Sequence, residues 1–338
     1  MESRKLVFMI LVTMQCNFQC LYCYEGKTKM NKMMDKCSAD AVIHFIQKND
    51  KLSDIDEVEI VFHGGEPLLN FNIIKYIVKK INSSKLAQNK FVHYHMTTNG
   101  YLLNDEIIDF IKTYIDDISV SMDGKKNTND KWRIDVAGNG TYDIVMKKSQ
   151  KLLQNQPNIA VRMTVNVADL HALVDNILHF VDKGFKKIIP VINIWDKKWK
   201  RDDIEYLGEI NEKIKELNNM NPNVKISLLI NKKTNKILKC SGGKESFCID
   251  AFGEIFPCIY SVGDKALSCG NVFEGLNQLA INKIEKIKKI HVIECQGCSY
   301  YDCCESVRCK FINKKYNGRY DVPIPLICNI ENMCFQYH

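Results

Sequence analysis

Segments with the composition of β-strands alternate with amphipathic, helix-like segments over the first 217 residues. Runs rich in apolar and β-branched residues predict strands over residues 6–13, 58–63, 91–97, 117–121, 159–166 and 187–194. Apolar residues that recur at helical spacing predict helices over residues 40–48, 73–81, 106–114, 142–153, 173–183 and 204–217. Apolar strands separated by crossover helices indicate a parallel α/β sheet or barrel. Six such units are too few for the usual eight-unit barrel.

Three cysteines follow the first predicted strand directly. Cys16, Cys20 and Cys23 stand in a C-x3-C-x2-C spacing within one short loop. Three thiolates so close together suit a metal or an iron–sulfur centre, and a cubane held by only three cysteines leaves one iron open. Two other readings remain: a zinc knuckle that lacks its fourth ligand, and three buried apolar cysteines.

Polar and glycine-rich motifs follow the next two predicted strands, where the functional loops of a parallel barrel lie. Gly64, Gly65 and Glu66 come after the second strand. Two glycines allow the backbone to approach a ligand closely, and a carboxylate can pair with an ammonium group. The polar sequence T-T-N-G at residues 97–100 follows the third strand. It indicates either a part of the site or an ordinary Asn-Gly turn.

Further candidate residues follow the fourth predicted strand. Ser121 and Asp123 carry a hydroxyl and a carboxylate at its end, and Arg133 comes ten residues later. A guanidinium group matches a carboxylate with two parallel hydrogen bonds, so Arg133 is a candidate for binding one. The alternative is an arginine on the surface at the start of a helix.

The cysteines are unevenly distributed along the chain. Of the 15 cysteines, four lie before residue 38 and eleven lie from Cys240 to Cys334, with none between Cys37 and Cys240. The odd number argues against a framework of disulfide bonds. Cluster or metal binding is the better explanation for both groups.

Size and charge exclude several classes of protein. The 338 residues, 46% of them apolar, are enough to bury a full core. No run of 18 apolar residues predicts a membrane-spanning helix, and no cleavage site follows the first apolar run. We therefore expect a cytoplasmic protein without a membrane partner. The net charge of +7 is spread over many lysines, which does not support nucleic-acid binding.

The cysteine loop, with Tyr22 before its last cysteine, resembles the signature of the radical S-adenosylmethionine (radical SAM) enzymes. The resemblance implies a partial (β/α)6 TIM-like barrel and a [4Fe–4S] cluster on the three loop cysteines. In this family the open iron binds the methionine group of S-adenosyl-L-methionine, and reductive cleavage gives a 5′-deoxyadenosyl radical. The resemblance also implies a set of cofactor-binding residues, which are Tyr24, Gly64, Gly65, Glu66, Ser121, Asp123 and Arg133.

The C-terminal cysteines resemble the SPASM domain, which carries two auxiliary [4Fe–4S] clusters in a subset of these enzymes. The resemblance assigns one cluster to Cys240, Cys248, Cys258 and Cys309. It assigns the other to Cys295, Cys298, Cys304 and Cys328. The spacing departs from the family pattern by one residue before Cys309, so Cys303 is an alternative to Cys304. A zinc-ribbon module is the alternative for the whole region, because C-x2-C pairs are typical of such sites.

The resemblance predicts a barrel over residues 1–217, a bridging region over 218–239 and a SPASM domain over 240–338. It implies an enzyme that modifies a ribosomally made precursor peptide or protein, with a thioether or carbon–carbon crosslink expected first. It also implies an electron donor such as flavodoxin or ferredoxin. Peptide epimerisation and sulfatase maturation are alternatives, although Ile259 stands where the sulfatase-maturing relatives have an aspartate. The non-enzymatic alternatives are an iron–sulfur electron carrier and a zinc scaffold.

Overall fold

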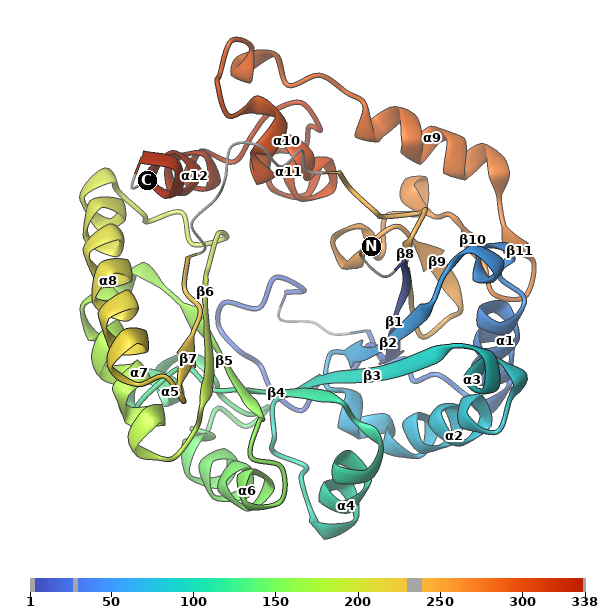
Figure 1. Cartoon of the computed structure of the whole chain (residues 1–338), viewed down its shortest axis with the longest axis horizontal. Coiled ribbons are helices and arrows are strands. Elements are labelled where there is room, and N and C mark those ends of the chain that lie inside the picture. The colour runs from blue at the N-terminus through green and yellow to red at the C-terminus, as the bar shows by residue number, and fades with distance from the viewer. Residues whose placement is uncertain (1–3, 27–29, 230–238, 337–338) are drawn as a thin grey trace.

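The computed structural model describes residues 4–26, 30–229 and 239–336. A strongly curved sheet forms most of a ring, and helices cover its outer side (Figure 1). Seven strands of this sheet run parallel in chain order from β1 to β7. Their bounds are Lys5–Thr13 (β1), Glu57–Gly64 (β2), Phe91–Thr98 (β3), Asp117–Ser121 (β4), Ala160–Val165 (β5), Lys187–Ile192 (β6) and Lys225–Ile226 (β7). The predicted partial α/β barrel is therefore confirmed.

The longer outer helices pack on the sheet through one apolar face each. In α2, for example, Ile74, Ile77, Val78 and Ile81 are buried at the spacing of a single helix face. The helices of this layer are α1 (Lys36–Gln47), α2 (Phe71–Asn82), α3 (Lys85–Asn89), α4 (Asp105–Tyr114), α5 (Lys126–Trp132), α6 (Tyr142–Asn155), α7 (Leu173–Asp182) and α8 (Arg201–Met220). All six predicted strands and all six predicted helices are present, whereas the short α3 and α5 were not predicted.

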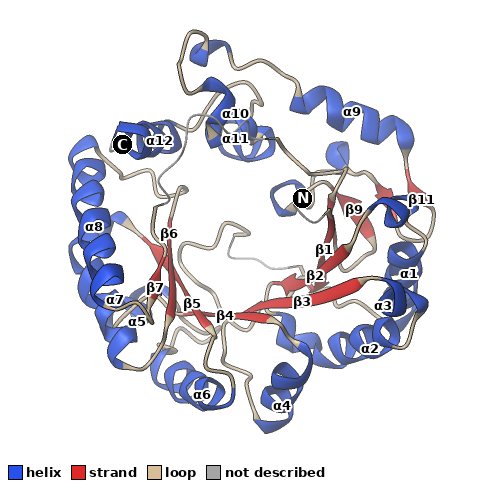
Figure 2. Ribbon diagram, viewed as in Figure 1, coloured by secondary structure: helices blue, strands red, loops and turns tan. Residues whose placement is uncertain are grey.

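The cysteine-rich region continues the same sheet. Strand β8 (Ser246–Ile249) pairs in parallel with β1, so that Cys248 lies opposite Met9. The sheet then continues in antiparallel fashion through β9 (Glu254–Phe256), β10 (Gly270–Asn271) and β11 (Gly275–Leu276) (Figure 2). Strand pairing thus crosses residue 240, and the division into three regions stays a prediction.

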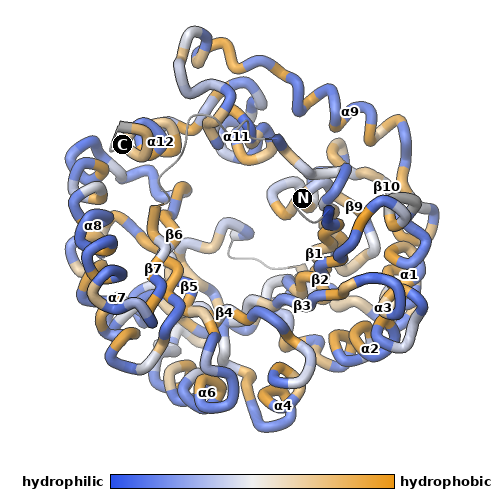
Figure 3. Tube along the Cα trace, viewed as in Figure 1, coloured by the Kyte–Doolittle hydropathy of each residue, from blue (hydrophilic) through white to orange (hydrophobic). Residues whose placement is uncertain are grey.

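Four helices of the C-terminal region lie across the ring from β3 and β4 (Figure 1). They are α9 (Gln278–Lys288), α10 (Glu305–Arg308), α11 (Lys310–Asn317) and α12 (Pro325–Gln336). The strands of the sheet are mainly apolar, whereas the helices mix polar and apolar turns (Figure 3). Within the described ranges, no helix is long and apolar enough to cross a membrane.

Candidate active site

The cysteine loop is held by the segment that follows α5. The backbone N–H of Gln19 donates to the carbonyl of Ile134 at 2.9 Å, and that of Leu21 donates to the carbonyl of Trp132 at 2.9 Å. Phe18 is buried in the core. The loop that carries the three cysteines is therefore fixed to the connection between β4 and β5, and not only to β1.

Gly64 and Gly65 lie against the backbone that leads from β1 into the cysteine loop. A Cβ atom on Gly64 would lie 2.3 Å from the carbonyl oxygen of Thr13, and one on Gly65 would lie 2.1 Å from that of Gln15. Both distances are shorter than any side chain tolerates. The two glycines were expected to allow close approach to a ligand. The close approach that the structure shows is to the chain's own backbone, directly before Cys16.

Glu66 joins the cysteine loop to the end of β3. Its N–H donates to the carbonyl of Gln15 at 2.8 Å, and its buried carboxylate accepts from Thr98 Oγ1 at 2.6 Å and from the N–H of Asn99 at 2.7 Å. A third donor is the N–H of Leu68 at 3.1 Å. Burial raises the pKa of Glu66 to about 7, and these three hydrogen bonds oppose the rise. A carboxylate has about four acceptor sites, so one remains for a ligand ammonium.

Asn99 belongs both to a turn and to the site. Its side-chain amide donates to Asn17 Oδ1 at 2.8 Å and lies 4.0 Å from the sulfur of Cys16. Gly100 adopts a positive φ of 75°, as an Asn-Gly turn requires. Both readings of the sequence T-T-N-G therefore apply, because the turn places Asn99 beside the first cysteine.

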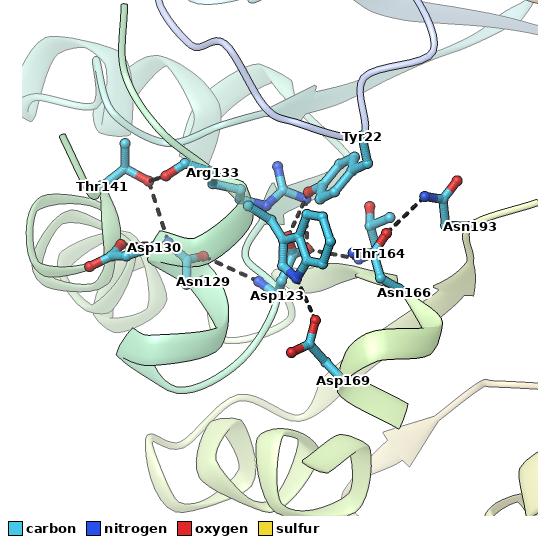
Figure 4. Close-up of polar contacts among 11 residues, drawn as sticks. Tyr22, Asp123, Asn129, Asp130, Arg133, Thr141, Thr164, Asn166, Asp169 and Asn193 are labelled. Atoms are coloured by element: carbon cyan, nitrogen blue, oxygen red, sulfur yellow. Dashed lines mark hydrogen bonds and ion pairs between the residues drawn. The ribbon is translucent and has the colours of Figure 1, made fainter. Parts of the chain in front are cut away.

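Asp123 and Arg133 form a buried ion pair with Tyr22 (Figure 4). Asp123 Oδ1 accepts from Arg133 Nη2 at 2.9 Å and from the N–H of Thr164 at 2.8 Å. Asp123 Oδ2 accepts from the hydroxyl of Tyr22 at 2.6 Å, and the guanidinium lies 5.4 Å from the centre of that ring. Arg133 is only 7% exposed. The alternative of a surface arginine is therefore wrong.

One N–H group of the Arg133 guanidinium is available to a ligand. Its Nε is buried and has no hydrogen-bond partner among the described residues. A buried donor without a partner is costly, so this atom fits a carboxylate that arrives with a ligand. The carboxylate of Asp123 already has three donors from the chain. The structure thus gives Asp123 a positioning contact, while its direct contact with a cofactor stays a prediction, as does that of Ser121 at the end of β4.

The sequence motifs did not include several residues that lie in this site. Trp132 lies beside Tyr22, with 6.2 Å between ring centres, and its Nε1 donates to Asp169. Asn166 and Asn193 follow β5 and β6 and are joined by a 2.8 Å hydrogen bond (Figure 4). Asn166 Nδ2 is buried without a partner among the described residues, so it is a further candidate donor to a ligand. The sequence could have indicated Asn166 and Asn193, because both stand at the ends of predicted strands, where the functional loops of a parallel barrel lie.

Tyr24 faces the C-terminal region. Its ring centre lies 6.1 Å from that of Tyr260, and the ammonium of Lys315 lies 5.0 Å from the Tyr24 ring. Burial raises the pKa of Tyr24. Tyr260 stands two residues after Cys258, so Tyr24 lies between the cysteine loop and the C-terminal cysteines. Its predicted role in cofactor binding stays a prediction.

The four cysteines assigned to one auxiliary cluster influence one another electrostatically. Burial raises the pKa of the Cys258 thiol to about 11, and the thiols of Cys309 and Cys240 add to the rise. Burial likewise raises the pKa of Cys248, with Cys258 contributing. Cys269 is fully buried nearby, as expected of a small apolar core residue. These thiols come from the segment before β8, from β8 itself, from the loop after β9 and from the residue directly before α11.

The second assigned set is gathered in the same way. Burial raises the pKa of the Cys295 thiol, with Cys328 and Cys298 adding to the rise. Burial raises the pKa of Cys304 to about 11, with a contribution from Cys328. Cys304 also packs in one small apolar cluster with Cys295. The thiol of Cys303 instead donates to the carbonyl of Tyr300 at 3.4 Å. Cys298 contributes to raising the pKa of the Cys303 thiol.

Over the part of the chain that is described, no three His, Cys, Asp or Glu side chains are arranged to hold a single metal ion. The donor chemistry of the sites is nevertheless that of iron–sulfur proteins, because each of the three sites offers thiols as its ligands. The loop at Cys16, Cys20 and Cys23 offers three, and each C-terminal set offers four.

A curved parallel sheet with a three-cysteine loop after its first strand and polar side chains at its strand ends is the arrangement of an α/β-barrel enzyme. The sequence profile of the radical SAM superfamily matches residues 10–180. The chain belongs to this superfamily, and its membership implies a [4Fe–4S] cluster and S-adenosylmethionine as cofactors. The expectation of a radical SAM enzyme is thereby confirmed.

Three proteins illustrate the similarity. The chain is 23% identical over 340 residues to a cysteine-type anaerobic sulfatase-maturating enzyme of Clostridium novyi, covering 86% of this chain and 84% of that protein. The structure of native anSMEcpe with bound AdoMet and the Cp18Cys peptide is similar at a TM-score of 0.78 and 19% identity, covering 98% and 96% of the two chains. Streptococcus suis SuiB bound to the precursor peptide SuiA is similar at a TM-score of 0.69 and 16% identity, covering 96% and 76%. At these identities the two structures show a shared fold.

Proposed function

We propose that this enzyme is a radical SAM maturase of a ribosomally made peptide. Cys16, Cys20 and Cys23 would hold the cluster to which S-adenosylmethionine binds. When bound, the cluster and S-adenosylmethionine together supply the 5′-deoxyadenosyl radical, which abstracts hydrogen from a substrate. The observation that carries the proposal is the cysteine loop fixed beside a buried arginine whose Nε has no described partner.

The protein's own side chains would bind the two ends of the methionine group. Arg133 would donate from Nε to the carboxylate, because that atom is buried and unpaired among the described residues. Glu66 would accept from the ammonium with its remaining acceptor site. Tyr22 and Asp123 would hold the arginine and the loop in register. Gly64 and Gly65 would keep the loop at the distance this requires, and Ser121 and Tyr24 stay candidates for the ribose and the adenine.

Two auxiliary [4Fe–4S] clusters are part of the proposal. Cys240, Cys248, Cys258 and Cys309 would hold one, and Cys295, Cys298, Cys304 and Cys328 would hold the other. Cluster binding requires these thiols as thiolates, whereas burial raises the pKa of several of them in the metal-free protein. Their assembly into two groups supports cluster binding, because a cluster supplies the positive charge that the buried thiolates need.

A peptide substrate is supported by the shared fold, since both solved structures named above contain a bound peptide. A thioether or carbon–carbon crosslink removes two hydrogens from the peptide. One would leave as an atom to the radical, and the other would leave as a proton, with its electron passing to an iron–sulfur cluster as oxidant. An electron donor such as flavodoxin or ferredoxin would reduce the enzyme between turnovers.

Sulfatase maturation is the second candidate, favoured by the similarity to the Clostridium novyi enzyme over most of both chains. One position argues against it. Ile259, where the sulfatase-maturing relatives have an aspartate, packs against the apolar cluster of Leu11, Cys248 and Phe256. This position thus offers no carboxylate as a base. We therefore place crosslinking first and peptide epimerisation next.

The first experiment tests cofactor chemistry. The reconstituted enzyme should contain about 12 irons per chain, as three cubanes require. On reduction with dithionite, it should convert S-adenosylmethionine into 5′-deoxyadenosine. A variant with Cys16, Cys20 and Cys23 replaced by alanine should lose this activity and keep about 8 irons. A fully loaded protein that forms no 5′-deoxyadenosine would instead be an electron carrier, and bound zinc in place of iron would indicate a scaffold.

The second experiment tests the reaction on a peptide. A small cysteine-bearing peptide encoded beside the gene is co-expressed with the enzyme and analysed by mass spectrometry. Loss of two hydrogens together with loss of a free thiol supports a thioether. An unchanged mass with a D-residue after hydrolysis indicates epimerisation. An aldehyde formed on a sulfatase peptide would establish the second candidate.

A further inference from the structure

A pocket in the C-terminal region lies between the two proposed auxiliary cluster sites. Its lining includes Cys240 from the first set and Cys304 from the second. Cationic side chains predominate around it: Lys239, Lys244, Lys288, Lys289, Arg308 and Lys310 contribute to the wall, against three acidic residues. The pocket therefore places a concentration of positive charge between two groups of thiols.

Lys310 differs from the other lysines of this pocket. It is the first residue of α11, directly after Cys309, and it is only 3% exposed. Its ammonium makes no hydrogen bond or ion pair with any residue in the described ranges. Lys288, in the same wall, pairs with Glu285 at 2.5 Å and donates to the carbonyl of Gly242 at 3.0 Å. The side chain of Lys310 is therefore packed in the wall, while its ammonium reaches the pocket and is not fixed there by a hydrogen bond to a described residue.

The groups that act electrostatically on the Lys310 ammonium are cysteines of both sets and the carboxylate of Asp321. Burial lowers the pKa of Lys310, and the thiols of Cys295, Cys304 and Cys309 each oppose that effect. Asp321 opposes it as well. Cysteines that ligate a metal do so as thiolates. Cluster binding would therefore surround Lys310 with negative charge from two directions.

We infer that Lys310 is the shared counter-charge of both auxiliary cluster sites, placed in the wall between Cys240 and Cys304. The inference rests on the proposed auxiliary clusters and needs only the fixed charge of the ammonium. A nearby positive charge stabilises the reduced, more negative state of a cluster and so raises its reduction potential. The negative charge of Glu331 would instead lower the reduction potential, and it acts on Cys304 and Cys328 of the second set. The charge of Lys310 interacts with cysteines of both sets.

The test uses the full chain with Cys16, Cys20 and Cys23 replaced by alanine, so that only auxiliary clusters contribute signals. Reduction potentials are measured by electron paramagnetic resonance during redox titration. Lys310→Met should shift both auxiliary potentials downward, and Lys310→Arg should restore them because it keeps the charge. Lys289→Met is the matched control: Lys289 lines the same pocket but is exposed, so its charge is screened and its removal should leave both potentials unchanged.

A second readout is the iron content of the two variants. If Lys310→Met fails to load its auxiliary clusters and Lys310→Arg loads them, the counter-charge role is supported. Unchanged potentials in a fully loaded Lys310→Met, or a shift of one cluster only, would overturn it. A parent protein without auxiliary iron would overturn the proposed clusters themselves, and this inference with them.

Discussion

The hydroxyl of Tyr22 donates a 2.6 Å hydrogen bond to the carboxylate of Asp123, 101 residues further along the chain. The other oxygen of that carboxylate holds Arg133 at 2.9 Å. Tyr22 stands between the second and third cysteines of the loop. One buried carboxylate thus fixes both the cysteine loop and the arginine proposed to bind the cofactor.

Replacement of Tyr22 by phenylalanine removes this hydrogen bond and leaves the buried Asp123 carboxylate one donor short. We expect a loss of about 1–3 kcal/mol in the free energy of unfolding. The cost is measured by denaturant unfolding of the metal-free protein, and weaker S-adenosylmethionine binding is measured on the reconstituted enzyme. Tyr114→Phe is the control, since Tyr114 is exposed on α4. Equal stability of the two variants would contradict the role assigned to Tyr22.

Replacement of Gly65 by alanine places a Cβ atom against the carbonyl of Gln15, directly before Cys16. The backbone must move to accommodate it, so the cysteine loop should lose its cluster while the auxiliary clusters remain. Iron content should fall from about 12 to about 8 per chain, with no 5′-deoxyadenosine formed. Gly138→Ala is the control for backbone strain alone, because Gly138 has a positive φ of 85° but no atom lies within 4 Å of the added methyl group there. Full iron loading of Gly65→Ala would argue against this account.

Glu66 should make the stability of the metal-free protein depend on pH. Its carboxyl has a pKa of about 7 in the folded protein, against an ordinary value of 4.5. Between these values the folded state keeps a proton that the unfolded state has released. Stability should therefore fall as the pH rises from 4.5 to 7, by on the order of 3 kcal/mol.

The check is a pair of unfolding series over this pH range. Glu66→Gln cannot titrate, so its series should lack this fall, and the difference between wild type and variant isolates the Glu66 contribution. Parallel series would show that the pKa of Glu66 is not raised. S-adenosylmethionine should reduce the pH dependence of the reconstituted enzyme, because an ammonium beside Glu66 favours the charged carboxylate.

Cys303 and Cys304 should respond differently to alanine. Cys304 packs with Cys295 of its assigned set, whereas Cys303 donates to the carbonyl of Tyr300. Cys304→Ala should lower the iron content by about four, the content of one cubane, and Cys303→Ala should keep it. Iron and sulfide analysis of the two variants, prepared side by side, decides between them. Loss of a cluster only in Cys303→Ala would move the ligand to that position.

The fold was predictable from sequence where each segment carried its own signal. The six long parallel strands and the amphipathic helices show their apolar pattern locally, as Ile107, Ile108 and Ile111 of α4 illustrate. Strands β8 to β11 are two to four residues long, which is too short for such a pattern. Pairing of β8 with β1 depends on residues some 240 positions apart, which no local pattern records.

The site was predictable as a list of residues but not as a set of contacts. The motifs placed Glu66 and Asp123 at strand ends and Arg133 ten residues further on, and the structure brings all three around the cysteine loop. The sequence did not indicate that Asp123 accepts from three donors, or that Trp132 lies beside Tyr22. These contacts join segments far apart in the chain, so they follow from the closure of the barrel.

The parallel pairing of β8 with β1 also protects a sheet edge. Strand β1 has β2 on one side and β8 on the other. Without the cysteine-rich region, the N–H and carbonyl groups of β1 that face β8 would lie open along the apolar sequence between Leu6 and Val12. Such an edge is a template for pairing with another chain. Removal of the C-terminal region should therefore yield an aggregating fragment, and not a smaller enzyme.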